Sequence, residues 1–518
     1  MRACVVYILR QRVWAVIQPD DGGDPSMPPR AKSNKQTSID IFQTRGCGYS
    51  NTGARGGIRG LIQLEILHLL EKEFNFRIPV RFFFDLVIGS GSGSIPTLGL
   101  FASDWTINEC EESFSTICKE GFVGDSLHRF RNLHRRLGKS SKSRYGSANL
   151  EKTLKQVFSE SQPLFGGSNA GKLGTNTKVA VSAISSNGRA TLFPNYNRRS
   201  IPYPAYRLFR PETEQNEIKL WEAARASMSN QLFFNPFKHK SSNEVYSHEN
   251  SNVSNPIIMA DTEYKAIWRD APSNYPDLLL WIGTGTADTE IPLSERPSSR
   301  NPSVKSKKDS LKKIKQKQSH SRSVEERQEK IWDDYLNSLP VDAPTSNFTH
   351  LNVQVPEVPA SDDIDSLDFF HNMARKFIDE SEIRTLASRI FATFFYFDGE
   401  IEETPNKELF LKGEILCRLS DYTPEIREIG ILLQDGQFGS PGFVIQEQCK
   451  ELRYFGLTSE IVDDMIFNLH FQMPGIKFRI SSKTPMIDMK IRFEKSDDYS
   501  ISGFPRAFKE DQSQAQAK

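Results

Sequence analysis

The sequence predicts an α/β protein, and three observations support this. Residues 82–88 form an aromatic and β-branched run typical of a buried strand, and a turn made only of Gly and Ser leads from it into the apolar residues 97–101. A glycine-rich loop runs into residues 61–74, whose apolar positions recur at helical spacing. Residues 178–184 are a further strand-like run. These strand, turn and helix steps predict an α/β fold.

Length and composition set wide bounds on the protein. A chain of 518 residues is long enough for two to four domains, and 37% hydrophobic residues with 11% aromatics fill ordinary cores. The net charge is only +1, so the balance of the whole chain argues neither for nor against nucleic acid. We therefore predict no specific nucleic-acid partner.

The cysteines and the apolar segments predict a compartment. The six cysteines are scattered and form no Cys-x-x-Cys pair, so neither a zinc site nor a disulfide framework is indicated. No cofactor is predicted. The apolar run at residues 3–9 is cut by Arg10 and Arg12 and lacks a small-residue cleavage site. No stretch approaches about 18 apolar residues. These features predict a cytoplasmic protein, peripheral to membranes at most and not secreted.

The glycine-rich loop is the first candidate site. Residues 1–47 are predicted to be a disordered lead-in, because residues 18–47 are rich in Pro, Gly, Ser and charge without a sustained period. The loop then reads Gly56, Gly57, Ile58, Arg59 and Gly60. Such a loop points several backbone N–H groups at one spot and adds the helix dipole, which suits a phosphate or an oxyanion. A simple tight turn is the alternative.

The second candidate is the Gly/Ser turn after residues 82–88. The nucleophile-elbow pattern is Gly-x-Ser-x-Gly, because two glycines let the backbone make the strained turn. Here Gly89 and Gly93 supply the only such frame, and its central residue is Gly91. Neither Ser90 nor Ser92 has a glycine two positions away. A Gly/Ser turn without a chemical role is the alternative.

Two such loops within about forty residues, with the segments that follow, resemble the patatin-like phospholipase family. Its Asp-Gly-Gly-Gly-x-Arg-Gly loop is matched at residues 56–60 and its elbow at residues 83–94. The resemblance extends over residues 48–290, and its further matching segments are residues 105–118, 178–184, 221–229, 233–237, 255–256 and 278–285.

The resemblance implies a three-layer α/β/α sandwich with a mostly parallel sheet that hydrolyses acyl esters of lipids with a Ser-Asp dyad and no metal. Its glycine loop would stabilise the oxyanion. On this chain the nucleophile position falls on Gly91 and the dyad Asp on His248, so both positions are substituted. Ala54 and Arg55 also stand where the family has Asp and Gly. The implied ligand is a lipid or fatty-acyl group.

Beyond residue 290 the chain changes character. Residues 291–326 are rich in Lys and are predicted to be a basic, disordered linker. Three roles stay open for it: a solvated linker, a nuclear-localisation-like cluster, or a patch attracted to anionic lipid heads. Residues 327–506 predict a separate α+β domain, similar to a region that accompanies patatin domains in some fungal proteins. Its Asp362, Asp363 and Asp365 are more typical of helix caps than of metal ligands. Residues 507–518 are a predicted disordered tail.

The predicted strands of this region are residues 394–397, 415–419, 443–446, 476–481 and 486–493, after a helical stretch at 365–392.

Three functions stay open. The chain is a catalytically impaired patatin-like protein that still binds lipid, an active acyl hydrolase that uses a displaced Ser90 or Ser92, or a decayed copy without a lipid role. Losing a nucleophile costs on the order of a millionfold in turnover, which favours the first.

Overall fold

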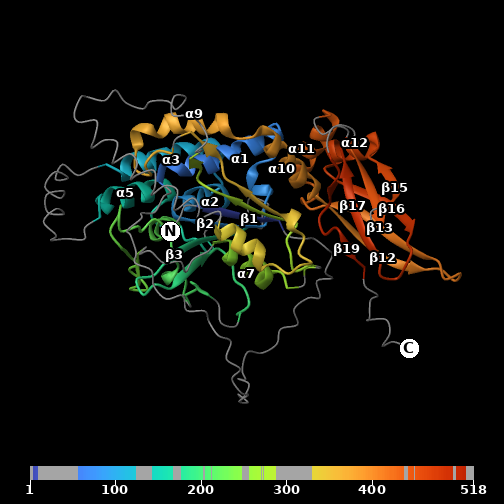
Figure 1. Cartoon of the computed structure of the whole chain (residues 1–518), viewed down its shortest axis with the longest axis horizontal. Helices are drawn as coiled ribbons and strands as arrows, with labels where there is room; N and C mark the ends of the chain where they lie inside the picture. The colour runs from blue at the N-terminus through green and yellow to red at the C-terminus, as the bar shows by residue number, and fades with distance from the viewer. Residues whose placement is uncertain are drawn as a thin grey trace, which may run out of the picture.

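The chain folds around one large sheet, with smaller sheets in its C-terminal part (Figure 1). The computed structural model describes residues 4–9, 57–123, 143–166, 177–201, 205–211, 213–247, 256–269, 271, 273–287, 330–356, 358–436, 441–447, 450–493 and 497–508. The strands of the large sheet and of its margins are β1 (Cys4–Leu9), β2 (Leu86–Ser90), β3 (Lys178–Ile184), β4 (Ala190–Pro194), β5 (Tyr206–Leu208), β6 (Phe237–Lys238), β7 (Val245–Tyr246), β8 (Leu278–Ile282), β9 (Thr286–Ala287), β10 (Phe348–Leu351) and β11 (Gln354–Val355). The helices around it are α1 (Leu61–Glu73), α2 (Ser94–Ala102), α3 (Ile107–Gly121), α5 (Ser147–Phe158), α6 (Leu220–Ser227), α7 (Pro256–Ile267), α9 (Leu367–Phe377) and α10 (Glu380–Ala392).

The large sheet has seven strands in the order β10-β8-β1-β2-β3-β4-β5. Three of its six neighbouring pairs are parallel, namely β10–β8, β2–β3 and β4–β5, so the sheet is mixed. The antiparallel strand β1 separates β8 from β2, which leaves β10, β8, β2 and β3 running in one direction. The carboxyl ends of these four strands therefore share one edge of the sheet.

Helices cover both faces of this sheet, and alternation along β2 shows how. Val87 belongs to the core on the side of α1, α2, α3, α5 and α6, whereas Leu86 and Ile88 belong to the core beneath α7. Successive side chains of a strand point to opposite faces, so a strand buried on both sides reads as the continuous apolar run seen here. The three-layer α/β/α sandwich is thus confirmed.

Strand β1 corrects the prediction that residues 1–47 are a disordered lead-in. Cys4–Leu9 pairs antiparallel with β2 on one side and with β8 on the other. An apolar, β-branched segment in a central position satisfies its backbone donors and acceptors through both neighbours, and this outweighs the short length of the run. The rest of the predicted lead-in lies outside the described residues.

The predicted domain boundary at residue 327 does not coincide with a packing boundary. Strand β10 extends the large sheet by pairing parallel with β8. Helical residues 330–338 lie on the α7 face, where the Trp332 ring is 5.9 Å from that of Trp281. On the other face α9 and α10 pack against α1, as Figure 1 shows. The chain after residue 330 therefore completes the sandwich first, and only then forms the separate C-terminal sheets.

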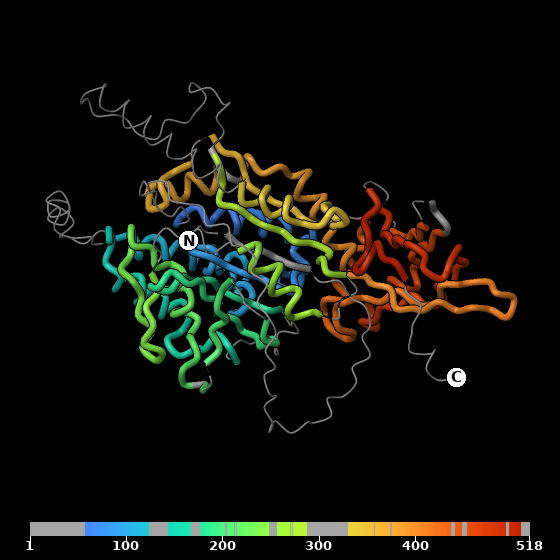
Figure 2. Tube along the Cα trace, turned by 60° about the horizontal axis from the view of Figure 1, so that its bottom comes forward, coloured from blue at the N-terminus to red at the C-terminus, as the bar shows by residue number. Residues whose placement is uncertain are grey.

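The remaining C-terminal elements form two antiparallel sheets beside the sandwich. They are β12 (Phe395–Glu403), β13 (Leu409–Cys417), β14 (Gly442–Glu447), β15 (Lys450–Gly456), β16 (Gln472–Arg479), β17 (Met486–Arg492), β18 (Tyr499–Ser500), β19 (Arg506–Ala507), α11 (Pro424–Gln434) and α12 (Ser459–Asn468). One sheet has the order β12-β13-β16, and the other β15-β14-β17-β18 with β19 on β17. The hairpin of β12 and β13 projects from the body of the molecule (Figure 2). Each predicted strand of this region overlaps one of these, and Ala507 in β19 corrects the start of the predicted tail.

Two further sequence predictions meet the structure only in part. The basic segment at residues 291–326 lies outside the described residues. Within the described parts of the chain, no helix is both long enough and apolar enough to cross a bilayer.

Cys110, Cys118 and Cys417 are free thiols, and burial raises the pKa of Cys118 to about 12.

Candidate functional site

The predicted elbow is a strand, a single 3₁₀ turn and a helix in direct succession. Strand β2 ends at Ser90, the turn spans Gly91–Gly93, and α2 begins at the next residue. Gly91 has a φ of +60°, a left-handed conformation that disfavours residues with a Cβ. Its N–H donates to Ser227 Oγ (2.8 Å), and that hydroxyl donates to the Ser182 carbonyl (2.8 Å). Ser227 of α6 thereby joins the elbow to β3.

Close packing between α2 and the end of β2 explains the glycine at position 89. A Cβ built on Gly89 would lie 2.4 Å from Thr97 Oγ1, so only glycine allows the helix to approach the strand. The Thr97 hydroxyl donates to the Gly93 carbonyl (2.9 Å), and the Ser94 hydroxyl donates to the Gly91 carbonyl (2.7 Å). The turn is therefore held by side chains of the helix that it opens.

The two serines beside Gly91 face different surroundings. Ser90 ends β2 two residues after Ile88, so alternation places its side chain on the α7 face, away from α2 and α6. Ser92 instead faces the glycine loop, because its Oγ lies 3.3 Å from a Cβ built on Gly60. Both hydroxyl oxygens are buried and have no hydrogen-bond partner within the described part of the chain.

The glycine loop lies beside the elbow, as the resemblance implied. Its described part is a 3₁₀ turn over Gly57–Gly60 that runs directly into α1, while Gly56 lies outside the described residues. A Cβ on Gly60 would lie 2.6 Å from Phe114 Cζ, so this close approach to α3 requires glycine. The predicted oxyanion loop and the predicted elbow thus meet at one place, between Gly60 and Ser92.

A distant segment of the chain lies on the glycine loop, which the sequence analysis did not predict. The Ile58 N–H donates to the Ser361 carbonyl (3.0 Å), and Arg59 donates to the Pro359 carbonyl through Nε (2.9 Å) and a second nitrogen (2.5 Å). Gly57 has a φ of +53°, and a Cβ on it would lie 1.8 Å from the Ser361 oxygen. One predicted oxyanion donor is therefore occupied by the chain itself.

The predicted base position, His248, lies outside the described residues. The residue before it is described: the Ser247 N–H donates to the Ile184 carbonyl at the end of β3 (3.0 Å). Strand β3 pairs parallel with β2, and its Ser182 is in register with Ser90. The described chain therefore reaches position 247 at the same edge of the sheet as the elbow.

A cluster of ionisable groups lies where α1, α3 and α9 meet. Burial alone would raise the pKa of Glu65, but hydrogen bonds from His371 Nε2 (2.7 Å) and Arg375 Nε (2.5 Å) bring this pKa below its usual value. The hydrogen bond to Glu65 in turn raises the pKa of His371. Ligand atoms of Glu65, Glu111 and His371 lie within 4.8 Å of one another, as in a metal site. Because Arg375 also bonds to Glu65, we interpret the cluster as the anchor of α9.

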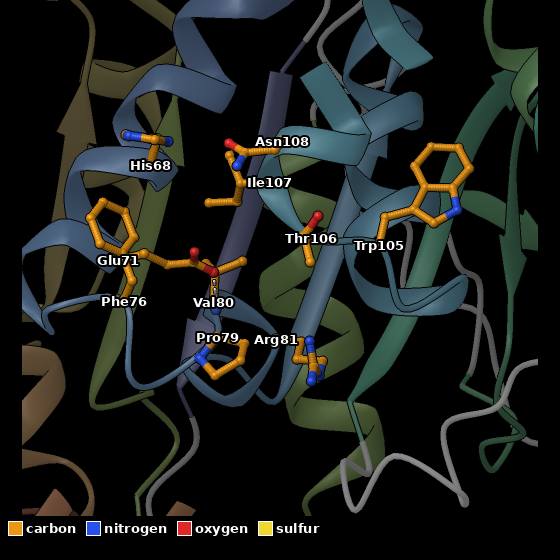
Figure 3. A pocket seen from close by; sticks show the side chains of 10 residues that line it. All are labelled: His68, Glu71, Phe76, Pro79, Val80, Arg81, Trp105, Thr106, Ile107 and Asn108. Carbon is orange, nitrogen blue, oxygen red and sulfur yellow. Dashed lines mark hydrogen bonds between the residues drawn. The ribbon is translucent and has the colours of Figure 1, made fainter. Parts of the chain in front are cut away.

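A separate pocket of about 360 Å³ lies between the carboxyl-terminal part of α1 and the start of α3 (Figure 3). It is lined by His68, Glu71, Phe76, Pro79, Val80, Arg81, Trp105, Thr106, Ile107 and Asn108. Its polar groups already serve the fold: Glu71 accepts from the Val80 N–H (2.7 Å), and Thr106 forms the capping box of α3 with Glu109. None of the predicted site residues lines this pocket.

Comparison with known proteins identifies the same region. Residues 56–249 match the patatin-like phospholipase family, a span that includes the glycine loop, the elbow and position 248. No curated protein and no solved structure matches the chain. Over residues 56–249 the chain is therefore similar to a patatin-like phospholipase domain.

Proposed function

We propose that this protein is a lipid-binding member of the patatin-like family that lacks acyl-hydrolase activity. The observation that carries the proposal is Gly91 at the apex of the elbow, where the family's nucleophile would stand. Glycine has no hydroxyl to activate. Its positive φ and its N–H bond to Ser227 support the view that this turn has settled around glycine.

Retention of the site supports binding over decay. Side chains at Gly57, Gly60 and Gly89 would collide with neighbouring atoms at 1.8, 2.6 and 2.4 Å. The elbow, the start of α2 and the described part of the glycine loop are thus closely packed and regular, whereas a collapsed site would have favoured the decayed copy. A lipid or fatty-acyl group is the ligand that the family resemblance favours.

One observation favours a second candidate, an active hydrolase with Ser92 as a displaced nucleophile. Ser92 Oγ faces Gly60 of the glycine loop and has no hydrogen-bond partner among the described residues. The described residues also offer it no hydrogen-bonded base, and His248 is the candidate for that role. Because roughly 1 Å of misplacement can cost about a hundredfold in rate, this candidate ranks below the first.

Ester hydrolysis and covalent labelling test both candidates. The wild type is expected to hydrolyse no short-chain ester above a no-enzyme control and to resist a fluorophosphonate probe. Gly91→Ser with His248→Asp restores the family's two groups and is expected to give measurable turnover, because one oxyanion donor is worth about 10² to 10³ in rate. Wild-type labelling that Ser92→Ala abolishes, and Ser90→Ala leaves intact, would replace the first candidate with the second.

We also propose that the protein contacts anionic membranes through its Lys-rich segment in a cytoplasmic setting. Each well-placed Lys contributes about 1 kcal/mol near an anionic surface, and screening shortens this attraction to about 8 Å at physiological salt. Binding to anionic vesicles is expected to weaken as salt rises. Unchanged binding after neutralising Lys312, Lys313, Lys315 and Lys317 would leave the segment as a solvated linker.

A further inference from the structure

The segment that covers the glycine loop has a second anchor next to the first. We call residues 358–363 the strap. Besides the Ser361 carbonyl on the Ile58 N–H, the strap holds the Asp362 carboxylate between the Arg144 guanidinium and the Tyr145 hydroxyl (2.8 Å to the latter). These two oxygens belong to consecutive residues, whose Cα atoms are about 3.8 Å apart. A carbonyl oxygen and an anionic group therefore fill two neighbouring sets of donors.

These two oxygens have the chemistry of a phospholipid. An ester carbonyl is the group that the glycine loop of an acyl hydrolase polarises. A guanidinium donates to phosphate and to carboxylate with the same planar geometry, and a tyrosine hydroxyl adds a further donor. We propose that the strap is an internal substitute for an anionic lipid, in which Ser361 replaces the ester carbonyl and Asp362 replaces the phosphate. This inference rests on the lipid-binding function proposed above.

The surroundings of Arg144 suit the junction of a head group and an acyl chain. The guanidinium lies 5.9 Å from the centre of the Phe233 ring. Phe122, Tyr145 and Phe234 continue this aromatic cluster, with ring centroids 5.3 to 6.2 Å apart. A cation above an aromatic floor places a phosphate donor directly beside apolar surface. A lipid needs this combination, whereas a free phosphate does not.

The strap is held by a small number of polar contacts. The Ile58 N–H and the Arg59 side chain donate to its carbonyl oxygens, and Asp362, whose side chain is 9% exposed, pairs with Arg144, whose side chain is 43% exposed. Both ends of the strap are held by other contacts, through β11 on β9 before it and through Leu367 and Phe370 in the core after it. Opening therefore moves only a short segment and leaves α9 on α1.

The experiment compares variants of the full chain with three probes. Asp362→Ala removes the anionic strap group, and Asp368→Ala, an exposed acidic residue at the start of α9, is the matched control. Asp362→Ala with Arg144→Ala removes the phosphate receptor as well. The probes are dihexanoylphosphatidic acid below its micelle concentration, dihexanoylglycerol with the same chains and no phosphate, and inorganic phosphate. Binding is measured by calorimetry, and strap opening by hydrogen exchange of residues 358–363.

Asp362→Ala is expected to speed hydrogen exchange in the strap and to tighten binding of dihexanoylphosphatidic acid by about tenfold, whereas Asp368→Ala changes neither. Adding Arg144→Ala should abolish the gain for the phospholipid and spare dihexanoylglycerol. If exchange speeds up and phospholipid affinity stays the same, the strap inference is wrong. Inorganic phosphate that binds as tightly as the phospholipid would overturn the lipid assignment.

The outcome also separates this inference from the proposed function. Dihexanoylglycerol reports acyl binding without the phosphate site. If it binds while the phospholipid gains nothing from Asp362→Ala, lipid binding stands and only the strap inference fails. If dihexanoylglycerol binds to none of the variants, including those with the strap open, the proposed lipid-binding function itself fails.

Discussion

Strand β2 has opposite chemistry at its two ends. Just before the strand, Asp85 accepts from Arg418 Nη1 (3.1 Å), and the same guanidinium donates to the carbonyl oxygens of Phe82 and Phe83. At its other end, the hydroxyl oxygens of Ser90, the last residue of the strand, and of Ser92 are buried without a partner in the described structure. The first end is bonded tightly by the C-terminal part of the chain, whereas the second end leaves polar groups unpaired.

The difference separates an end of the strand that contributes to stability from the end to which we assign the proposed function. A buried polar group without a partner destabilises the fold by about 1 to 3 kcal/mol, so folds keep few of them. At the Asp85 end these hydrogen bonds hold Arg418, and with it the C-terminal sheets, on the sandwich. At the elbow end the two unpaired hydroxyls lie on opposite sides of the sheet, and only that of Ser92 faces the glycine loop, where the proposed ligand would supply a partner.

The largest expected effect breaks the docking end. Arg418→Met removes one member of a buried pair whose side chains are 4% and 11% exposed, and it leaves Asp85 without its cation. Removing one partner of such a pair typically costs about 3 to 5 kcal/mol. Denaturant unfolding should show this loss. Arg479→Met, whose side chain is 70% exposed in its pair with Glu408, is the control and should change stability by less than about 1 kcal/mol.

The next effect tests the same end through pH. Burial raises the pKa of Asp277 to about 7, above its unfolded value, although hydrogen bonds from Gly503 N–H (3.0 Å) and Ser502 Oγ (2.7 Å) oppose the shift. The folded state therefore binds the extra proton between about pH 4 and pH 7, and this contribution to stability is lost as pH rises through 7.

Between pH 5 and pH 8 the free energy of unfolding should fall by about 2 to 3 kcal/mol from this group. Asp277→Asn keeps an oxygen that accepts from Ser502 and should remove that part of the pH dependence. Urea titrations at the two pH values measure it. An equal fall in the variant would mean that Asp277 is ionised in the folded protein throughout this range.

A smaller pair of effects tests the elbow end. Ser227→Ala removes the hydroxyl that bonds both the Gly91 N–H and the Ser182 carbonyl, and it should lower the free energy of unfolding by about 1 to 3 kcal/mol. Ser90→Ala removes a buried hydroxyl without a partner and should be neutral or stabilising by up to about 1 kcal/mol. Replacing Ser by Ala is thus expected to lower the free energy of unfolding at position 227 and to leave it unchanged or raise it at position 90. A loss for Ser90→Ala would mean that its hydroxyl is bonded in solution.

The smallest expected effect is an absence of change. Low-dose trypsin should cut the Lys-rich segment between residues 296 and 327, because its sequence predicts a segment with too few apolar residues to pack and many Lys for the protease to recognise. The nicked chain should still elute as one species, since β10 remains in the large sheet with β8 and Arg418 remains on Asp85. Size-exclusion chromatography followed by a denaturing gel checks this. Fragments that separate would restore the boundary at residue 327.

Features set by local interactions could be predicted from the sequence, whereas contacts between distant residues could not. The elbow and the glycine loop could be predicted, because a strand, a turn and a helix leave local patterns of apolar residues and glycines. The strap on Ile58 could not, because a backbone carbonyl three hundred residues away is available in every residue type and leaves no pattern. The same holds for Ser227, whose hydroxyl is ordinary until the fold places it on Gly91.

The sequence by itself determined the α/β class, the order of the main elements and the glycine at the centre of the predicted elbow, since each depends on residue type and local spacing. Only the tertiary structure decided that Cys4–Leu9 fills a central place in the sheet, that the chain after the linker completes the sandwich, and that Ser361 occupies the glycine loop. These depend on which backbone groups remain unpaired once the sheet has formed, and that is a property of the assembled fold rather than of any one segment.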